Sequence, residues 1–414
     1  MTTRSRSPGR IRRSSTSRGR SPPSSATQRA CPSRPTRPAR PLSSRTLRAS
    51  TSAPSAYSTS TSNTRSEPSG RPFVLGQIQG QSHAVEAIRR AFVSGRLHHA
   101  YLFAGPDGVG KGLLATAYVS ALLCPQRGAQ GDACSTCSTC LRVRAGSHPD
   151  VHRVARREKD DGGLEPQIKI EAVRDLQHAL SFKPFEANYR VVIIYEADRM
   201  NASTANALLK TLEEPGANTH FVLITALPNL LLPTILSRCQ RIRFAPLSRA
   251  FVAAHLSREC ELDPVMADLV AGLAEGSIGK GRALCKSELL AERAALLARV
   301  EGRDEDDVAL PSIRRVPEAL SLAESLAGRK AELPFFFQLV RTWYRDVMLS
   351  QAGLRDEQLV HRDRAALVHK RASELKSADV LERLVRVNDT ERALDQAANV
   401  RLSLETLLLR LARG

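Results

Sequence analysis

Two patterns alternate along the chain between about residue 72 and residue 246. Short continuous apolar runs, of the length expected for buried strands, are separated by stretches with helical spacing. The apolar runs are residues 101–103, 191–194 and 221–224, and the helical stretches include residues 113–123 and 202–212. Alternating strands and helices are typical of an α/β layer built on a parallel sheet. The pattern therefore predicts an α/β domain over residues 72–246.

The strand pattern ends after residue 244, and Pro246 marks a hinge. Residues 247–305 have the pattern of a small helical unit. The acidic segment 301–307 is interpreted as a second linker, because it is followed by a proline. Helical apolar spacing resumes over residues 312–414, which predicts a third, all-helical domain.

Residues 1–70 consist mainly of Ser, Arg, Thr and Pro, a composition that predicts disorder. They contain 14 Arg, no Lys and one acidic residue, Glu67, so they carry +13 of the formal net charge of +19. The rest of the chain is only mildly basic, and the total charge alone does not indicate binding to a polyanion. Three interpretations of the segment stay open: a nonspecific phosphate-binding tail, an extension from a misassigned start codon, and an organelle transit peptide. We favour a tail without chemistry or a start-site artefact.

The sequence argues against membrane and secreted proteins. No apolar run approaches the roughly 18 residues of a membrane helix, and no continuous apolar stretch follows the early arginines, as a secretory signal would require. We therefore expect a cytoplasmic protein. A sequence-specific DNA-binding protein is a weak alternative, because neither a helix-turn-helix nor a zinc finger with paired histidines is visible.

A glycine-rich loop follows the first predicted strand. Gly105-Pro106-Asp107-Gly108-Val109-Gly110-Lys111-Gly112 has the spacing of a P-loop up to its last position. In such a loop, backbone N–H groups surround phosphate oxygens and the lysine lies against the β- and γ-phosphates. A strand before the loop and a helix after it favour this interpretation over an ordinary glycine-rich turn.

Two magnesium ligands of a working P-loop are missing. The Ser or Thr hydroxyl that holds the metal is replaced by Gly112, and the Asp expected after the strand 191–194 is replaced by Tyr195. Glu196 remains and has the chemistry to polarise a water molecule. Without the metal that neutralises the phosphates, hydrolysis should be very poor. We expect no ATP hydrolysis by this chain alone, and whether nucleotide binds through Lys111 stays open.

Four cysteines lie close together directly after the predicted P-loop helix. They are Cys124, Cys134, Cys137 and Cys140. Four thiolates at this spacing are typical of a closed tetrahedral zinc site, which is structural because no position is left for substrate. A redox-active or merely structural set of thiols is the alternative.

Several motifs, in the same order and spacing, resemble the clamp-loader AAA+ subunits of bacterial DNA polymerase III. The resemblance covers roughly residues 72–414 and is weaker after residue 300. The segments that carry it are 97–106, the four-cysteine module, His148-Pro149-Asp150, 168–174, 206–215, Thr225, 233–239, 276–284 and 399–405. The resemblance implies an AAA+ P-loop domain with an inserted zinc module at about 124–140, a helical lid domain and a helical collar domain.

The resemblance also implies roles for individual residues. Within the family, the absent magnesium ligands bring the chain closer to the delta-prime branch than to the motor subunits gamma and tau. The Ser-Arg-Cys arginine, Arg238, would then serve as an arginine finger in the nucleotide site of a neighbouring motor subunit. Taken alone, Arg238 is an ordinary solvated or salt-bridging residue. Thr225 corresponds to sensor 1 and Arg282 to sensor 2, and both would line a degenerate nucleotide site with Gly105, Gly108, Gly110, Lys111 and Glu196.

The implied assembly is a heteropentameric ring with gamma or tau and delta subunits, held by the collar. The ring loads a sliding clamp onto primed DNA. This subunit would contact the clamp only indirectly, and it would contact the DNA through the DNA backbone. The competing hypothesis is an active ATPase motor subunit of the same complex. Gly112 and Tyr195 favour the silent subunit.

Overall fold

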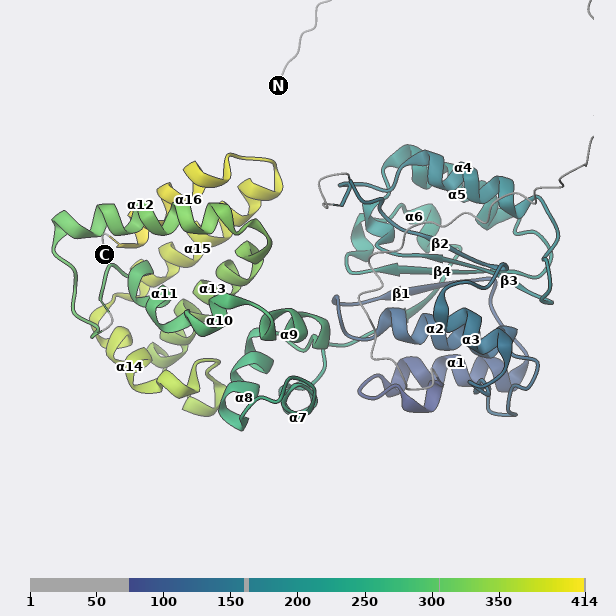
Figure 1. Cartoon of the computed structure of the whole chain (residues 1–414), viewed down its shortest axis with the longest axis horizontal. Helices are drawn as coiled ribbons and strands as arrows, with labels where there is room; N and C mark the ends of the chain where they lie inside the picture. The colour runs from purple at the N-terminus through teal and green to yellow at the C-terminus, as the bar shows by residue number, and fades with distance from the viewer. Residues whose placement is uncertain (1–73, 160–163, 305, 413–414) are drawn as a thin grey trace, which may run out of the picture. The chain divides into compact units, whose positions relative to one another are not determined.

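The computed structural model describes residues 74–159, 164–304 and 306–412 (Figure 1). The Arg- and Ser-rich segment 1–70 lies outside the described residues, so its three interpretations stay predictions.

Five parallel strands form one sheet in the order β2-β3-β4-β1-β5. Their bounds are β1 Ala100–Ala104, β2 Val151–Val154, β3 Arg190–Ile194, β4 Thr219–Thr225 and β5 Gln240–Arg243. The three apolar runs predicted as strands are β1, β3 and β4, so this prediction is confirmed. They occupy the three central positions of the sheet. The sequence pattern missed β2, an edge strand that is only partly buried and in which two of four residues are polar.

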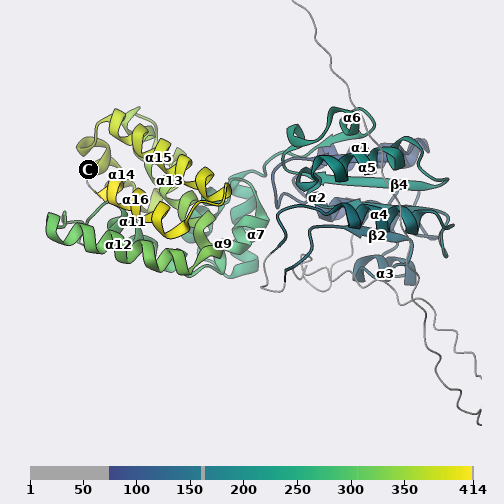
Figure 2. The ribbon, with the colours of Figure 1, turned by 90° about the horizontal axis from the view of Figure 1, so that it is seen from above.

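Helices cover both faces of the sheet, so the domain has three layers (Figure 1). They are α1 Ser82–Ser94, α2 Lys111–Leu123, α3 Ser138–Ala145, α4 Ile170–Leu180, α5 Ala202–Glu213 and α6 Pro233–Leu236. Alternate residues of β1 point to opposite faces: Tyr101 and Phe103 pack with α1 and α2, whereas Leu102 packs with α4 and α5. Figure 2 looks onto the α4 and α5 face. This architecture confirms the predicted α/β class.

All regular elements described after β5 are helical. They are α7 Arg249–Cys260, α8 Pro264–Leu273, α9 Ile278–Cys285, α10 Glu288–Ala291, α11 Arg293–Val300, α12 Ser312–Gly328, α13 Leu333–Gln351, α14 Ala365–Glu374, α15 Ser377–Asp395 and α16 Val400–Ala412, with short 3-10 turns between some of them. One continuous cluster of buried apolar side chains extends from Leu247 in the first helical unit to Leu411 in the last helix. The all-helical character predicted for this part is therefore confirmed.

The acidic segment that the sequence suggests as a linker is held by a buried cation. Arg371 of α14 donates to Glu301 at 2.6 Å, and the two side chains are only 2% and 4% exposed. The same guanidinium pairs with Asp307 and with Glu374. Glu301 also accepts a hydrogen bond from the indole of Trp343 at 2.9 Å. The carboxylates of Glu301 and Asp307 thus bind the acidic segment to α13 and α14.

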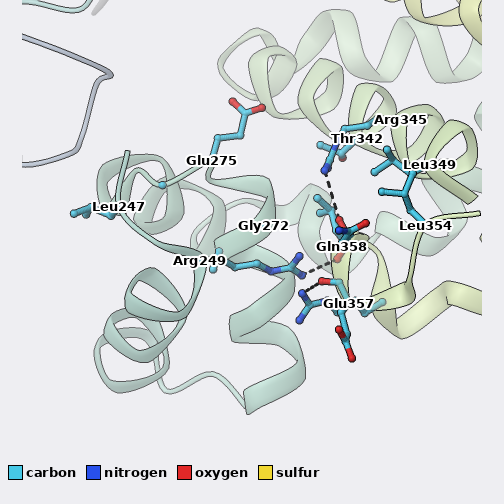
Figure 3. Close-up of a pocket in the computed structure, with 14 residues that line it drawn as sticks. Leu247, Arg249, Gly272, Glu275, Thr342, Arg345, Leu349, Leu354, Glu357 and Gln358 are labelled. Atoms are coloured by element: carbon cyan, nitrogen blue, oxygen red, sulfur yellow. Dashed lines mark hydrogen bonds between the residues drawn. The ribbon is translucent and has the colours of Figure 1, made fainter. Parts of the chain in front are cut away.

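A cavity of about 660 Å³ lies among α7, α8, α13 and the segment 354–362 (Figure 3). Arg249 at its wall donates to the carboxylate of Asp268 and to the carbonyl oxygens of Leu359 and Val360, so this arginine connects three segments. The cavity is lined by none of the site residues that the sequence predicts.

In the part of the chain that the structure describes, every helix is too short or too polar to cross a membrane.

Arg371→Ala should lower the free energy of unfolding of the helical region by about 3–5 kcal/mol, because Glu301 would stay buried without its partner. Trp343 is the chain's one tryptophan and touches Glu301, so its fluorescence during urea unfolding reports this region. Arg386→Ala is the matched control, since Arg386 forms a surface pair with Glu382 within one helix and should cost about 0.5 kcal/mol or less. Equal effects of the two substitutions would contradict the structural role of Arg371.

Candidate functional site

The glycine-rich loop leaves the sheet at the carboxyl ends of its central strands. Ala104, the last residue of β1, pairs with Thr225, the last residue of β4, and the Gly105 N–H donates to the Thr225 carbonyl at 3.2 Å. Lys111 begins α2 directly after the loop. Parallel sheets bind ligands at this edge, so the P-loop has the position that its motif requires.

The ammonium of Lys111 is engaged by its own loop. It donates to the carbonyl oxygens of Gly105 at 2.6 Å and Pro106 at 2.7 Å, and it pairs with Asp107 at 3.2 Å. An ammonium has three donors, and these contacts use all of them. Burial lowers the pKa of Lys111, while the carboxylates of Asp107 and Asp198 oppose the shift. A phosphate would have to displace the loop's own acceptors from this lysine.

The two substituted magnesium positions face each other. A Cβ atom placed on Gly112 would lie 3.7 Å from the ring of Tyr195, which is an ordinary van der Waals contact. The ring therefore lies beside the position from which a Ser or Thr hydroxyl would reach a metal. Gly112 has no side-chain oxygen, and Tyr195 has a neutral phenol in place of the carboxylate that magnesium takes from its position.

Glu196 is held by an arginine that the sequence reasoning did not single out. Arg156, just after β2, donates to both carboxylate oxygens of Glu196, at 2.5 Å and 2.8 Å. A carboxylate in a bidentate pair with a guanidinium is a poor general base, because its lone pairs are occupied and its charge is balanced. The one potentially catalytic carboxylate of the motif is thus directed at Arg156.

Thr225 lies at the site and is fully buried, but its hydroxyl donates to Asp198 in the 3-10 turn Ala197–Arg199. The backbone N–H of Ala226 donates to the same carboxylate oxygen at 3.3 Å. Asp198 is a site residue that the sequence reasoning missed. Its place two residues after Glu196 in the loop that follows β3 was the available signal.

Gly108 of the loop contacts the region after β5, and Gly110 directly precedes α2. The N–H of Gly279 donates to the Gly108 carbonyl at 3.1 Å, and a Cβ on Gly108 would lie 2.3 Å from the Ser277 hydroxyl oxygen. Only glycine fits this approach. Arg282, further along α9, instead pairs with Glu259 of α7 at 2.8 Å. The structure therefore brings together the loop, Lys111 and Thr225, whereas the ion pair of Arg282 within the described residues is with Glu259.

Arg238 lies between α6 and β5. Its guanidinium donates to the Thr234 carbonyl at 2.9 Å and pairs with Glu213, the last residue of α5, at 2.6 Å. The arginine side chain is 34% exposed. Next to it, Cys239 is buried, and burial raises its pKa to about 12. Arg238 is thus a partly exposed cation beside a buried, neutral thiol that fixes the end of the segment.

The four cysteines of the predicted module converge. Their sulfur atoms all lie within 4.8 Å of one another, with 4.0 Å between Cys124 and Cys137 and 3.9 Å between Cys134 and Cys140. Four thiolates around a zinc ion at about 2.3 Å have sulfur separations of about 3.8 Å. The donor set and spacing therefore fit a tetrahedral zinc ion, with α2 ending just before Cys124 and α3 beginning after Cys137.

Backbone N–H groups point at these sulfurs. The N–H of Cys137 donates to the Cys134 sulfur at 3.4 Å, and the N–H of Cys140 donates to the Cys137 sulfur at 3.5 Å. N–H groups of Thr136 and Cys137 lower the pKa of Cys134 to about 6, whereas burial raises the pKa of Cys124 and of Cys140. A cation among the sulfurs would favour all four thiolates.

Two parts of the chain match described protein families. Residues 80–248 match the family described as DNA polymerase III, delta subunit, and residues 314–413 match DNA polymerase III, delta subunit, C terminal. The chain is 30% identical over 352 residues to DNA polymerase III subunit delta′ of Bacillus subtilis, covering 81% of this chain and 97% of the relative. It is also 30% identical over 276 residues to subunit tau of Escherichia coli, covering 63% of this chain and 42% of that relative.

Among solved structures, the chain is similar to a gamma subunit-related protein of DNA polymerase III from Thermotoga maritima. That match has 18% identity and a TM-score of 0.37, and it covers 79% of this chain and 98% of the other. The sequence match along nearly the whole Bacillus subtilis relative carries the assignment. This chain belongs to the delta-prime and tau/gamma family of DNA polymerase III clamp-loader subunits.

Proposed function

We propose that this chain is the delta-prime subunit of its clamp loader. In this role it joins gamma or tau and delta subunits in a heteropentameric ring in the bacterial cytoplasm and helps load the sliding clamp onto primed DNA. It does not hydrolyse ATP itself. It supplies Arg238 to the nucleotide site of a neighbouring motor subunit.

The observation that carries the proposal is the state of the chain's own P-loop. Gly112 and Tyr195 occupy the two positions where magnesium ligands belong, and a Cβ on Gly112 would lie 3.7 Å from the Tyr195 ring. Phosphoryl transfer is catalysed mainly by positioning and by charge stabilisation, and the metal supplies much of both. Since Arg156 also occupies Glu196, both the metal and the base are compromised at one site.

Arg238 has the chemistry for a role in a neighbour's site. A guanidinium stays charged, is planar and forms paired hydrogen bonds to phosphate oxygens. It is partly exposed, and its present partners are one carbonyl and one half-exposed carboxylate. A triphosphate offers more negative charge than that carboxylate and can compete for the cation.

The other regions follow the same proposal. The lid is assigned to residues 247–305 and the collar to residues 312–414, where subunits of the ring would pack. Contacts with DNA would be weak and directed to phosphates, since most of the excess positive charge belongs to residues 1–70. The clamp would be contacted through the other subunits.

The cysteine module would hold a structural zinc ion through Cys124, Cys134, Cys137 and Cys140. When bound, zinc supplies a closed tetrahedral cross-link and no open position for substrate. The four residues would join the end of α2 to the start of α3. The segment between the two helices has few buried apolar residues of its own, so the metal would stabilise it.

The purified chain should show no ATP turnover above that of its Lys111→Ala variant in a steady-state phosphate-release assay. The physical reason is the missing magnesium ligand pair. A purified gamma or tau subunit serves as the positive control. Turnover close to that control, abolished by Lys111→Ala, would show that the chain is an active motor.

Arg238→Ala should leave assembly of the reconstituted loader intact but lower its DNA-stimulated ATPase. The ATPase rate of the neighbouring site should fall about 10³-fold or more. The ATPase rate of the whole loader should therefore fall by the fraction that this site contributes. Arg238→Lys should restore little, because an ammonium lacks the planar fork. Arg241→Ala, an exposed arginine of β5, is the matched control. Unchanged ATPase in an assembled ring would reduce Arg238 to a structural residue.

Protein produced with zinc available should contain about one zinc ion per chain by elemental analysis. Cys134→Ser should lower both the zinc content and the thermal midpoint, because three thiolates bind zinc more weakly than four. Cys260→Ser, outside the module, should leave the zinc content unchanged. A zinc content far below one ion per chain in the unaltered protein would refute the metal site.

A further inference from the structure

The pairing of Arg238 with Glu213 points to a role for the carboxylate. Glu213 is the last residue of α5, and its Oε1 atom lies 2.6 Å from the Arg238 guanidinium. Arg238 also donates to Thr234 in its own segment. The guanidinium is therefore held at two points, one of them on a separate helix.

Glu213 is poorly placed to stabilise its own helix. A carboxylate at a helix C-terminus faces the negative end of the helix dipole, which is unfavourable. The side chain is 47% exposed, so packing does not explain it either. Within the described residues, Glu213 forms its ion pair with Arg238. The charge at this position thus acts mainly on the arginine.

We propose that Glu213 is a positioning residue that holds Arg238 back until a nucleotide phosphate of the neighbouring subunit replaces it. This inference rests on the proposed trans role of Arg238. Glu213 and the phosphate compete for the same donors, so the guanidinium can serve only one of them fully. The pair is half-exposed and therefore weak enough to be exchanged. Binding of ATP next door would transfer the cation from α5 to the nucleotide.

Removal of the competitor should tighten nucleotide binding at the neighbouring site. In the reconstituted loader, Glu213→Gln should bind the slowly hydrolysed analogue ATPγS about two- to fivefold more tightly, as expected for loss of an exposed ion pair. The difference from the unaltered loader should shrink as salt is raised, because the pair is screened. Glu214→Gln is the matched control, since no ion pair of Glu214 is found in the part of the chain that the structure describes.

Two further measurements separate this inference from the proposed function. In an Arg238→Ala background, Glu213→Gln should have no effect, because Glu213 acts through the arginine. In the isolated chain, Glu213→Gln should speed modification of Arg238 by phenylglyoxal about two- to fivefold, read by peptide mass spectrometry, while Arg241 reacts at an unchanged rate.

The outcomes are distinct. Arg238→Ala without effect on the ring's ATPase overturns the proposed function. Arg238→Ala with an effect, together with Glu213→Gln that leaves ATPγS affinity unchanged or weakened, overturns the holding role alone. An unchanged phenylglyoxal rate in the isolated chain also overturns it.

Discussion

The parallel pairing of β1 with β4 determines where the P-loop of this chain begins. Because Ala104 is in register with Thr225, the P-loop begins beside the end of β4, and the loop after β3 opens at the same edge. Strands of a parallel sheet deliver their carboxyl ends together, so Asp198 lies close enough to Lys111 for its charge to oppose the lowering of the lysine pKa. The fold thus brings the predicted nucleotide-site residues to one edge of the sheet, where Gly112 and Tyr195 stand in place of the magnesium-binding chemistry of a working P-loop.

What replaces that chemistry is a set of internal partners. Lys111 binds the carbonyl oxygens of its own loop, Glu196 binds Arg156, and Thr225 binds Asp198. Each is a polar or charged group that would cost free energy if it were buried without a partner. In a working site, phosphate and metal would satisfy such groups. Here protein atoms do so, which makes the arrangement self-sufficient as a structure.

The sequence predicted the central strands, the P-loop and the cysteine module because each has a strong local signal. Continuous apolar runs identify buried strands, and Cys134, Cys137 and Cys140 have a metal-binding spacing. Edge strand β2 was missed because half of its residues are polar. Arg156 and Asp198 were missed for a different reason: their partners are distant in sequence, and only the register of β2, β3 and β4 brings them together. Long-range pairing of this kind leaves no periodic trace.

The two arginines of the family motifs differ in the surroundings of their ion-pair partners. Arg282 and Arg238 each follow a recognisable motif, yet the structure gives both of them a glutamate partner on another helix. Glu259 lies within a hydrogen-bonded set that includes His255, so several groups share the charge around Arg282. Arg238 has a simpler environment of one carbonyl and one exposed carboxylate. The partner of Arg238 is 47% exposed, whereas Glu259 is 32% exposed, so the Arg238 pair is the more strongly screened by solvent and costs less to break.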